Sequence, residues 1–250
     1  MPNVTEDAPR SVDQANRKLG LTEDNAGMRR QSRWLAPFGF MAAVVLLSPF
    51  AVQALLTLGR LRAVPPVDCI GRAEARLRIV YLHGRDTYGP SWVEVKNRET
   101  LRALARVLDA RVALPRTRDG WQKADADLLH VTAGAAQACF GETSSFGVLG
   151  FSDGGNAANQ LYLTCRGAMP RWVVSVGSEA SIPRKETRSW RECGPIALIA
   201  GRHEPTYLIT RSFARQLQQR RATATFIEHE GVHELPFTAT RRALAWVTWQ

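Results

Sequence analysis

From about residue 75 onward, the sequence alternates short runs of β-branched residues with segments of helical hydrophobic periodicity. Neighbouring parallel strands need a long crossover connection, usually a helix, so this alternation favours a mostly parallel sheet with helices on both faces. We therefore predict an α/β domain over residues 75–250, with about six parallel strands and no antiparallel edge hairpin before the first. The expected strands are 77–84, 111–116, 146–152, 172–178, 195–201 and 222–229, and the expected helices are 97–110, 124–138, 154–165, 207–221 and 236–248.

A long apolar segment precedes this domain. Residues 34–59 are 26 consecutive residues without Asp, Glu, Lys or Arg, which is long enough to cross a bilayer as a helix. Arg29, Arg30 and Arg33 stand before the segment, so the positive-inside rule puts the N-terminus in the cytoplasm and the domain in the periplasm or outside the cell. We expect an uncleaved, single-pass signal anchor. The alternative is a cleaved signal peptide and a secreted protein.

The segments that flank this apolar run are polar. Residues 1–33 mix charges of both signs with Pro, Asn, Gln and Ser, which is typical of a disordered tail, and residues 60–74 are expected to be a linker.

The net charge of +10 and the pI of about 10.2 make nucleic acid a partner to consider. The arginines are scattered, however, with no basic block interleaved with aromatic residues, so we expect no nucleic-acid partner; an anionic lipid surface suits this charge better.

Four cysteines follow the apolar segment. If the domain is exported they lie in an oxidising compartment, which favours two disulfides over four free thiols. No two of them have C-x-x-C spacing, which argues against a redox motif or a zinc ribbon. We expect the cysteines to lie near the sheet edge opposite the strand ends that carry the chemistry, and we favour the pair Cys165–Cys193. The other two are Cys69 and Cys139.

The strongest motif follows the third expected strand. Residues 150–154 read Gly-Phe-Ser-Asp-Gly and run directly into a helical segment. This G-x-S-x-G pattern between a strand and a helix is typical of a nucleophile elbow, in which a strained turn exposes the hydroxyl of Ser152. The alternative is an ordinary glycine-rich turn that holds a phosphate, although the spacing is not the G-x-G-x-x-G of a dinucleotide site.

A serine nucleophile needs a histidine base, which in turn needs an acid to orient it. Candidates follow the last two strands, with an acid, Glu204, in the run GRHEP and a histidine, His233, in the run EGVHELP. With these motifs the sequence resembles the α/β-hydrolase superfamily over residues 70–250. The resemblance implies Ser152 as nucleophile, His233 as general base and Glu204 as acid. Glu179 remains the second choice for the acid, and His229, still within a strand pattern, is expected to be structural. The histidines expected on the surface are His130 and His203.

The first strand ends in His83-Gly84, and in the resembling superfamily such a pair opens the loop that donates one oxyanion-hole amide. The implied donors are the backbone amides of Arg85 and Asp153. A plain turn after the strand is the alternative reading of His83-Gly84.

No cofactor and no metal are expected. The stretch between Gly177 and Cys193 is too short for a helical lid, and the aromatic residues that could line the site are Tyr88, Trp92, Trp121 and Tyr207.

Together these features predict a serine hydrolase that acts on a carboxylic ester, esterase-like, through an acyl-enzyme intermediate. The substrate would be a small-molecule or lipid-like ester presented to an open site. Two alternatives stay open. One is a non-catalytic binding protein at the membrane that keeps the fold, because fold alone does not imply function. The other is an acyltransferase, peptidase or thioesterase of the same fold.

Overall fold

The computed structural model describes residues 65–85, 92–117, 120–121, 128–141, 145–165, 170–182 and 188–250. By internal contacts the chain forms two units, Met1–Leu61 and Arg62–Gln250. All of the described residues belong to the second unit, which is the domain that the sequence predicts to be α/β.

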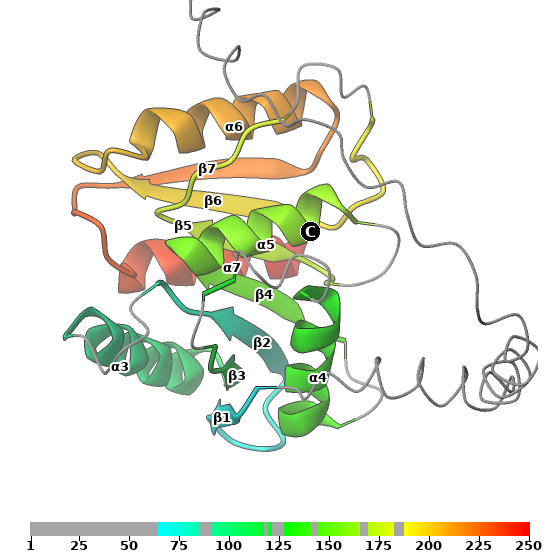
Figure 1. Ribbon diagram of the computed structural model, residues 1–250, viewed down its shortest axis with the longest axis vertical. Coiled ribbons are helices and arrows are strands. Elements are labelled where there is room, and N and C mark those ends of the chain that lie inside the picture. The colour runs from blue at the N-terminus through cyan, green and yellow to red at the C-terminus, as the bar shows by residue number, and fades with distance from the viewer. Residues whose placement is uncertain are drawn as a thin grey trace, which may run out of the picture. The chain divides into compact units, whose positions relative to one another are not determined.

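A seven-stranded sheet forms the centre of this domain (Figure 1). The strand order is β1-β3-β2-β4-β5-β6-β7, and β2 to β7 are parallel. The edge at which these six parallel strands end, which we call the carboxyl edge, collects the residues that follow each strand. The bounds are β1 Val67–Ile70, β2 Leu77–Leu82, β3 Ala110–Pro115, β4 Gly147–Phe151, β5 Val173–Val176, β6 Ile196–Gly201 and β7 Ala224–His229.

The seventh strand corrects the prediction of six. Strand β1 lies within the segment expected to be a linker, and it pairs antiparallel with β3, with Val67 opposite Pro115 and Ile70 opposite Val112. The expected count of six parallel strands therefore missed one antiparallel strand at the edge of the sheet. The physical reason is that β3 lies beside β2 with its other edge open, and an open edge pairs with any nearby extended segment.

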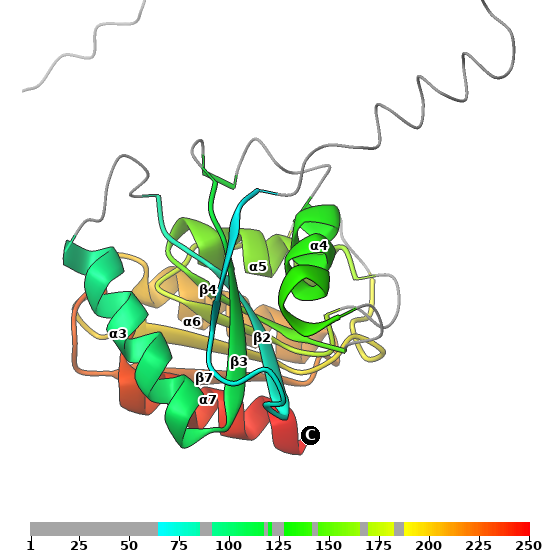
Figure 2. The ribbon, with the colours of Figure 1, turned by 90° about the horizontal axis from the view of Figure 1, so that it is seen from below.

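Helices cover both faces of the sheet. Alternate residues of the strands point to opposite faces, so Val80 and Val148 pack with α4, α5 and α6, whereas Ile79 and Leu149 pack with α3 and α7. Figure 2 shows α4 and α5 above the sheet and α7 below it. The bounds are α3 Trp92–Val107, α4 Leu128–Phe140, α5 Asp153–Leu163, α6 Tyr207–Gln219 and α7 Phe237–Trp249.

The domain contains two disulfides, as predicted. Cys69–Cys139 joins β1 to the end of α4, and Cys165–Cys193, the favoured pair, joins the chain after α5 to the chain before β6. The four cysteines thus form two separate pairs, and Cys69 lies within a strand.

The predicted membrane segment, residues 34–59, lies outside the described residues, as does the tail at 1–33. Of the helices that the structure does describe, none is long and apolar enough to cross a bilayer.

Candidate active site

Ser152 occupies a strained turn at the carboxyl edge. It stands between the last residue of β4 and the first residue of α5, with φ 56° and ψ −119°. A non-glycine residue in such a conformation costs on the order of 1–3 kcal/mol and persists only where its surroundings impose it. Here the Ser152 amide donates to the carbonyl of Val176 at 2.8 Å, and its carbonyl accepts from the Asn156 amide at 3.0 Å.

The two glycines that flank the turn are required by close packing. A Cβ at Gly150 would lie 2.1 Å from the carbonyl oxygen of Gly154, and a Cβ at Gly154 would lie 2.0 Å from that of Leu82. Both spacings are far below van der Waals contact, so no side chain fits at either position. The serine itself carries the positive φ, which favours a turn built to present that hydroxyl over a merely flexible glycine-rich loop.

His233 and Glu204 meet beside this turn. Nδ1 of His233, in the loop after β7, lies 3.3 Å from Oε2 of Glu204, in the turn after β6. The imidazole also packs on the ring of Phe151, with centroids 4.8 Å apart, and Phe151 immediately precedes Ser152. A Cβ at Gly177, at the end of β5, would lie 2.8 Å from Nδ1 of His233, so this glycine leaves room for the ring.

Ser152 and His233 form no direct hydrogen bond in the described part of the chain. Hydrogen bonds between catalytic groups often tighten only once substrate is bound. The residues brought into direct contact are therefore the candidate base and acid, while the candidate nucleophile is joined to them through its neighbour Phe151.

The carboxylate of Glu204 is fully buried and surrounded by donors. Oε1 accepts the Gly201 amide at 3.0 Å, and Oε2 accepts the Thr206 hydroxyl at 3.1 Å in addition to its contact with His233. Burial raises the pKa of this carboxyl, but the hydrogen bonds from His233, Gly201 and Thr206 outweigh burial and hold the pKa below its ordinary value. An ionised acid is the form that can orient and stabilise a histidine base.

The other candidate acid occupies a different environment. The side chain of Glu179 is exposed, and its backbone amide donates to Oδ1 of Asn156 at 2.7 Å. Of the two candidates, it is Glu204 that contacts His233.

His229 has a part in the site that the sequence did not predict. Its Nε2 lies 3.6 Å from Oε1 of Glu204, while its Nδ1 accepts the Gly231 amide at 3.1 Å. Because an amide can only donate, Nδ1 is the acceptor in this contact. Nε2 of His229 is buried beside the carboxylate but makes no hydrogen bond to it or to any other described residue. Glu204 thus contacts two histidines and is hydrogen-bonded to one of them, His233. The only sequence signal was a histidine at the end of the last strand.

The loop after β2 is held by its own histidine. Nε2 of His83 accepts the Thr117 amide at 3.3 Å, so the ring proton is on Nδ1, which donates to the Gly84 carbonyl at 2.6 Å. The carbonyl and the following N–H of a trans peptide point in opposite directions. His83 therefore fixes the direction of the Arg85 amide. Gly84 lies against the elbow, since a Cβ there would be 3.4 Å from Cβ of Ser152.

Asp153, the other implied oxyanion donor, is the first residue of α5, where backbone amides lack helical partners and favour negative charge. Its side chain is buried. Oδ2 accepts the Trp121 amide at 3.2 Å, and Oδ1 lies 3.5 Å from the Arg85 guanidinium. The indole of Trp121 donates to the His83 carbonyl at 2.8 Å. The side chains of the two candidate donor residues are thus paired, with Trp121 packed behind them.

The remaining candidates have other positions. The hydroxyl of Tyr207 donates to Glu228 at 2.8 Å, and His130 and His203 are exposed. Tyr88 and the side chain of Trp92 lie outside the described residues. In the described part of the chain, no group of three or more His, Cys, Asp or Glu residues is placed to hold a metal ion.

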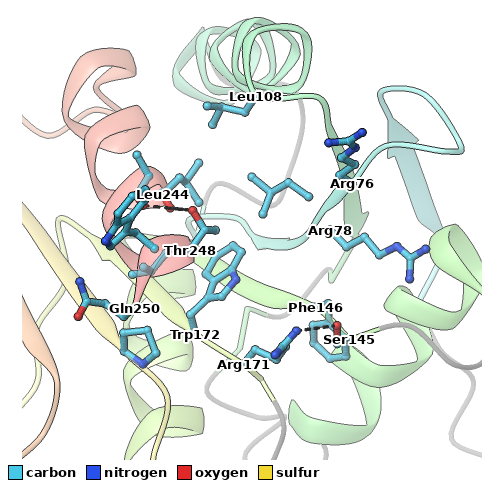
Figure 3. A pocket seen from close by; sticks show the side chains of 15 residues that line it. Arg76, Arg78, Leu108, Ser145, Phe146, Arg171, Trp172, Leu244, Thr248 and Gln250 are labelled. Atoms are coloured by element: carbon cyan, nitrogen blue, oxygen red, sulfur yellow. Dashed lines mark hydrogen bonds between the residues drawn. The ribbon is translucent and has the colours of Figure 1, made fainter.

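A cavity of about 720 Å³ lies at the edge opposite Ser152, between the starts of β2 and β5 and the last turn of α7 (Figure 3). Arg78, Arg171 and Trp172 are among its lining residues. It includes none of the candidate catalytic residues.

Neither a protein-family model nor a curated protein matches the sequence, but solved structures match the fold. A carboxylesterase from Mesorhizobium loti has a TM-score of 0.60 at 17% identity, covering 76% of this chain and 97% of its own. A fluorophosphonate-binding serine hydrolase from Staphylococcus aureus has 0.56 at 13%, covering 72% and 91%. A Bacillus cereus carboxylesterase has 0.54 at 16%, covering 75% and 95%. At these identities the likeness is one of fold, and the chain has the α/β-hydrolase fold.

Proposed function

We propose that this protein is a serine hydrolase that cleaves carboxylic esters. The observation that carries the proposal is the buried carboxylate of Glu204 holding His233 beside the strained turn of Ser152. A structural serine needs neither positive φ nor a neighbouring acid–base pair. The occurrence of carboxylesterases and serine hydrolases among proteins of the same fold supports the same reaction class.

In the proposed mechanism, Oγ of Ser152 attacks the ester carbonyl while Nε2 of His233 takes its proton. The amides of Arg85 and Asp153 donate to the oxyanion. The tetrahedral intermediate collapses to an acyl-enzyme as His233 returns the proton to the leaving alcohol. Water, activated by the same imidazole, then releases the acid. Glu204 keeps the proton of neutral His233 on Nδ1, so that Nε2 is free to accept.

The test is labelling of the full chain with a fluorophosphonate, together with turnover of a short acyl ester. The wild type should be labelled and active, and Ser152→Ala should lose both properties. Glu179→Gln, which changes an exposed carboxylate at the same edge, is the matched control and should keep both. Wild-type ester turnover by Ser152→Ala, measured beside a mock purification, would show that the serine mechanism is wrong.

We further propose that residues 34–59 anchor the protein, with the hydrolase domain in the periplasm or outside the cell. The two disulfides support this placement, because disulfides persist in oxidising compartments. Alkaline phosphatase fused after Gln250 should be active in a bacterial host, and the protein should remain with membranes after a high-salt wash. An inactive fusion would contradict export, and an active but freely soluble protein would indicate a cleaved leader instead.

A further inference from the structure

The direction of β1 decides where the chain enters the domain. Because β1 is antiparallel to β3, its first residue, Val67, lies opposite Pro115, the last residue of β3. The Arg116 amide donates to the Pro66 carbonyl at 2.9 Å. Residues 65 and 66 therefore lie at the carboxyl edge, the same edge as Ser152. A parallel first strand would have put the entry at the opposite edge.

The tether between this entry and the proposed anchor is short. From Gly59 to Pro65 there are six residue steps, which span at most about 20 Å at roughly 3.5 Å per residue. Helix α3, with its 16 residues, alone extends for about 24 Å from the carboxyl edge to the opposite edge. With the proposed anchor extending to Gly59, a tether of this length is shorter than α3 and keeps the carboxyl edge nearer the bilayer than the opposite edge.

Exposed apolar side chains are concentrated at the same edge. Five of the seven large hydrophobic residues that are exposed in the described part of the chain follow the carboxyl end of a strand, in the first turn of α3, α4 or α6 or in the loop between β7 and α7. The other two lie in the last turns of α3 and α7. The first group is Val95, Leu129, Leu208, Ile209 and Val232, and the second is Val107 and Trp249.

Two of these residues lie close to the candidate site: Val232 precedes His233 in the chain, and Val95 lies in the first turn of α3. Lys96, next to Val95, pairs with Glu234 in the His233 loop at 2.5 Å, and Arg98 pairs with Asp68 of β1 at 3.1 Å. The start of α3 thus lies between the entry of the chain and the loop that carries the base.

A lipid bilayer is the occupant that fits this edge. One or two apolar side chains on each of four separate connections suit a flat, fluid surface, into which each can insert independently.

We infer that the carboxyl edge rests on the membrane, so that Ser152 faces the bilayer and takes its ester substrates from the membrane surface. This inference rests on the proposed anchor and hydrolase function, and it narrows the substrate class to esters of membrane-resident, lipid-like molecules.

The matched pair Val95 and Val107 tests this orientation without relying on activity. Both are exposed valines of α3, with 43% and 57% of their surfaces accessible, at opposite ends of the helix. The full chain carrying Val95→Cys or Val107→Cys, with its four native cysteines in disulfides, is labelled with an environment-sensitive fluorophore. It is then reconstituted in vesicles of phosphatidylcholine and phosphatidylglycerol that contain headgroup nitroxide lipids. The Val95 label should be quenched several-fold more strongly. Equal quenching, stronger quenching at Val107, or failure of the chain to stay with the vesicles would overturn the inference.

An activity measurement separates this inference from the proposed function. The double variant Leu208→Ser with Ile209→Ser should hydrolyse a vesicle-borne ester several-fold more slowly than the wild type and a water-soluble ester at the same rate, whereas Val107→Ser should change neither rate. If the wild type hydrolysed neither ester, the proposed function would fail while the quenching result would still stand. Equal vesicle rates in the double variant and the wild type would count against the membrane-facing edge alone.

Discussion

Glu204→Gln separates the orienting role of this residue from simple packing. The wild-type carboxylate accepts from the Gly201 amide, the Thr206 hydroxyl and His233. An amide has one acceptor oxygen and an NH₂ group that must find acceptors. The backbone amide of Gly201 can only donate, so the side-chain oxygen of the new glutamine should replace Oε1, which faces Gly201. The side-chain NH₂ should then replace Oε2, which faces Thr206 and His233.

This orientation determines the size of the effect. The Thr206 hydroxyl can rotate to accept, so stability should fall only by about 1–2 kcal/mol, the difference between charge-assisted and neutral hydrogen bonds. His233, however, can accept at Nδ1 only by moving its proton to Nε2, the atom that must receive the serine proton. Turnover should therefore fall by about 10³–10⁴-fold, the scale expected when a triad histidine is held in the wrong tautomer.

The assay is kcat/KM for a short acyl ester beside urea denaturation of the same preparation, with Glu179→Gln as the control. Near-wild-type turnover in Glu204→Gln with a crippled Glu179→Gln would refute the reasoning and move the acid to Glu179. A loss of activity that merely tracked unfolding would also refute it.

The same variant has a pH signature. Because the pKa of Glu204 is lowered in the folded protein, its carboxylate contributes stability above its unfolded pKa, and this contribution is lost as the pH falls through the folded pKa. The stability difference between the wild type and Glu204→Gln should therefore shrink on acidification. A difference that grew toward acid pH would mean that the carboxyl is protonated in the native state.

Three further changes have defined outcomes. Gly177 has φ 56°, and in Gly177→Ala the new Cβ would lie 2.8 Å from Nδ1 of His233. The variant should lose most of its ester turnover at a temperature at which it is still folded; a folded variant with full activity would contradict that packing. His229→Phe removes a buried imidazole that contacts the acid at 3.6 Å without a hydrogen bond, so kcat/KM should fall by less than about tenfold, below the effect of losing one charged hydrogen bond, whereas exposed His203→Phe should leave it unchanged. Replacing Cys69 and Cys139 with serine opens a 70-residue loop and should lower the unfolding free energy by about 4 kcal/mol; an unchanged urea midpoint would exclude that.

Local patterns in the sequence were enough for much of this fold. All six predicted strands and all five predicted helices are present, although α3 begins five residues before its predicted start. Side chains on a strand or helix repeat with a fixed period, so a buried face can be read along the chain. The Ser152 elbow could be predicted because its whole motif lies within one strand–turn–helix unit. The contact that requires Gly150 is inside that unit, whereas the contact that requires Gly154 is with Leu82 of the neighbouring strand β2. The pair Cys165–Cys193 was also predicted correctly.

Strand β1 and the surroundings of Glu204 depended on the tertiary structure. Four residues, VDCI, form a strand because β3 offers an open edge and Cys139 fixes Cys69, and neither partner is near in sequence. The antiparallel direction, which brings the chain entry to the carboxyl edge, follows from that pairing alone. The choice of Glu204 as the partner of His233, and the approach of His229 to the same carboxylate, arise where β6 and β7 end side by side. Contacts across neighbouring strands depend on register, and register is set by the packed sheet as a whole.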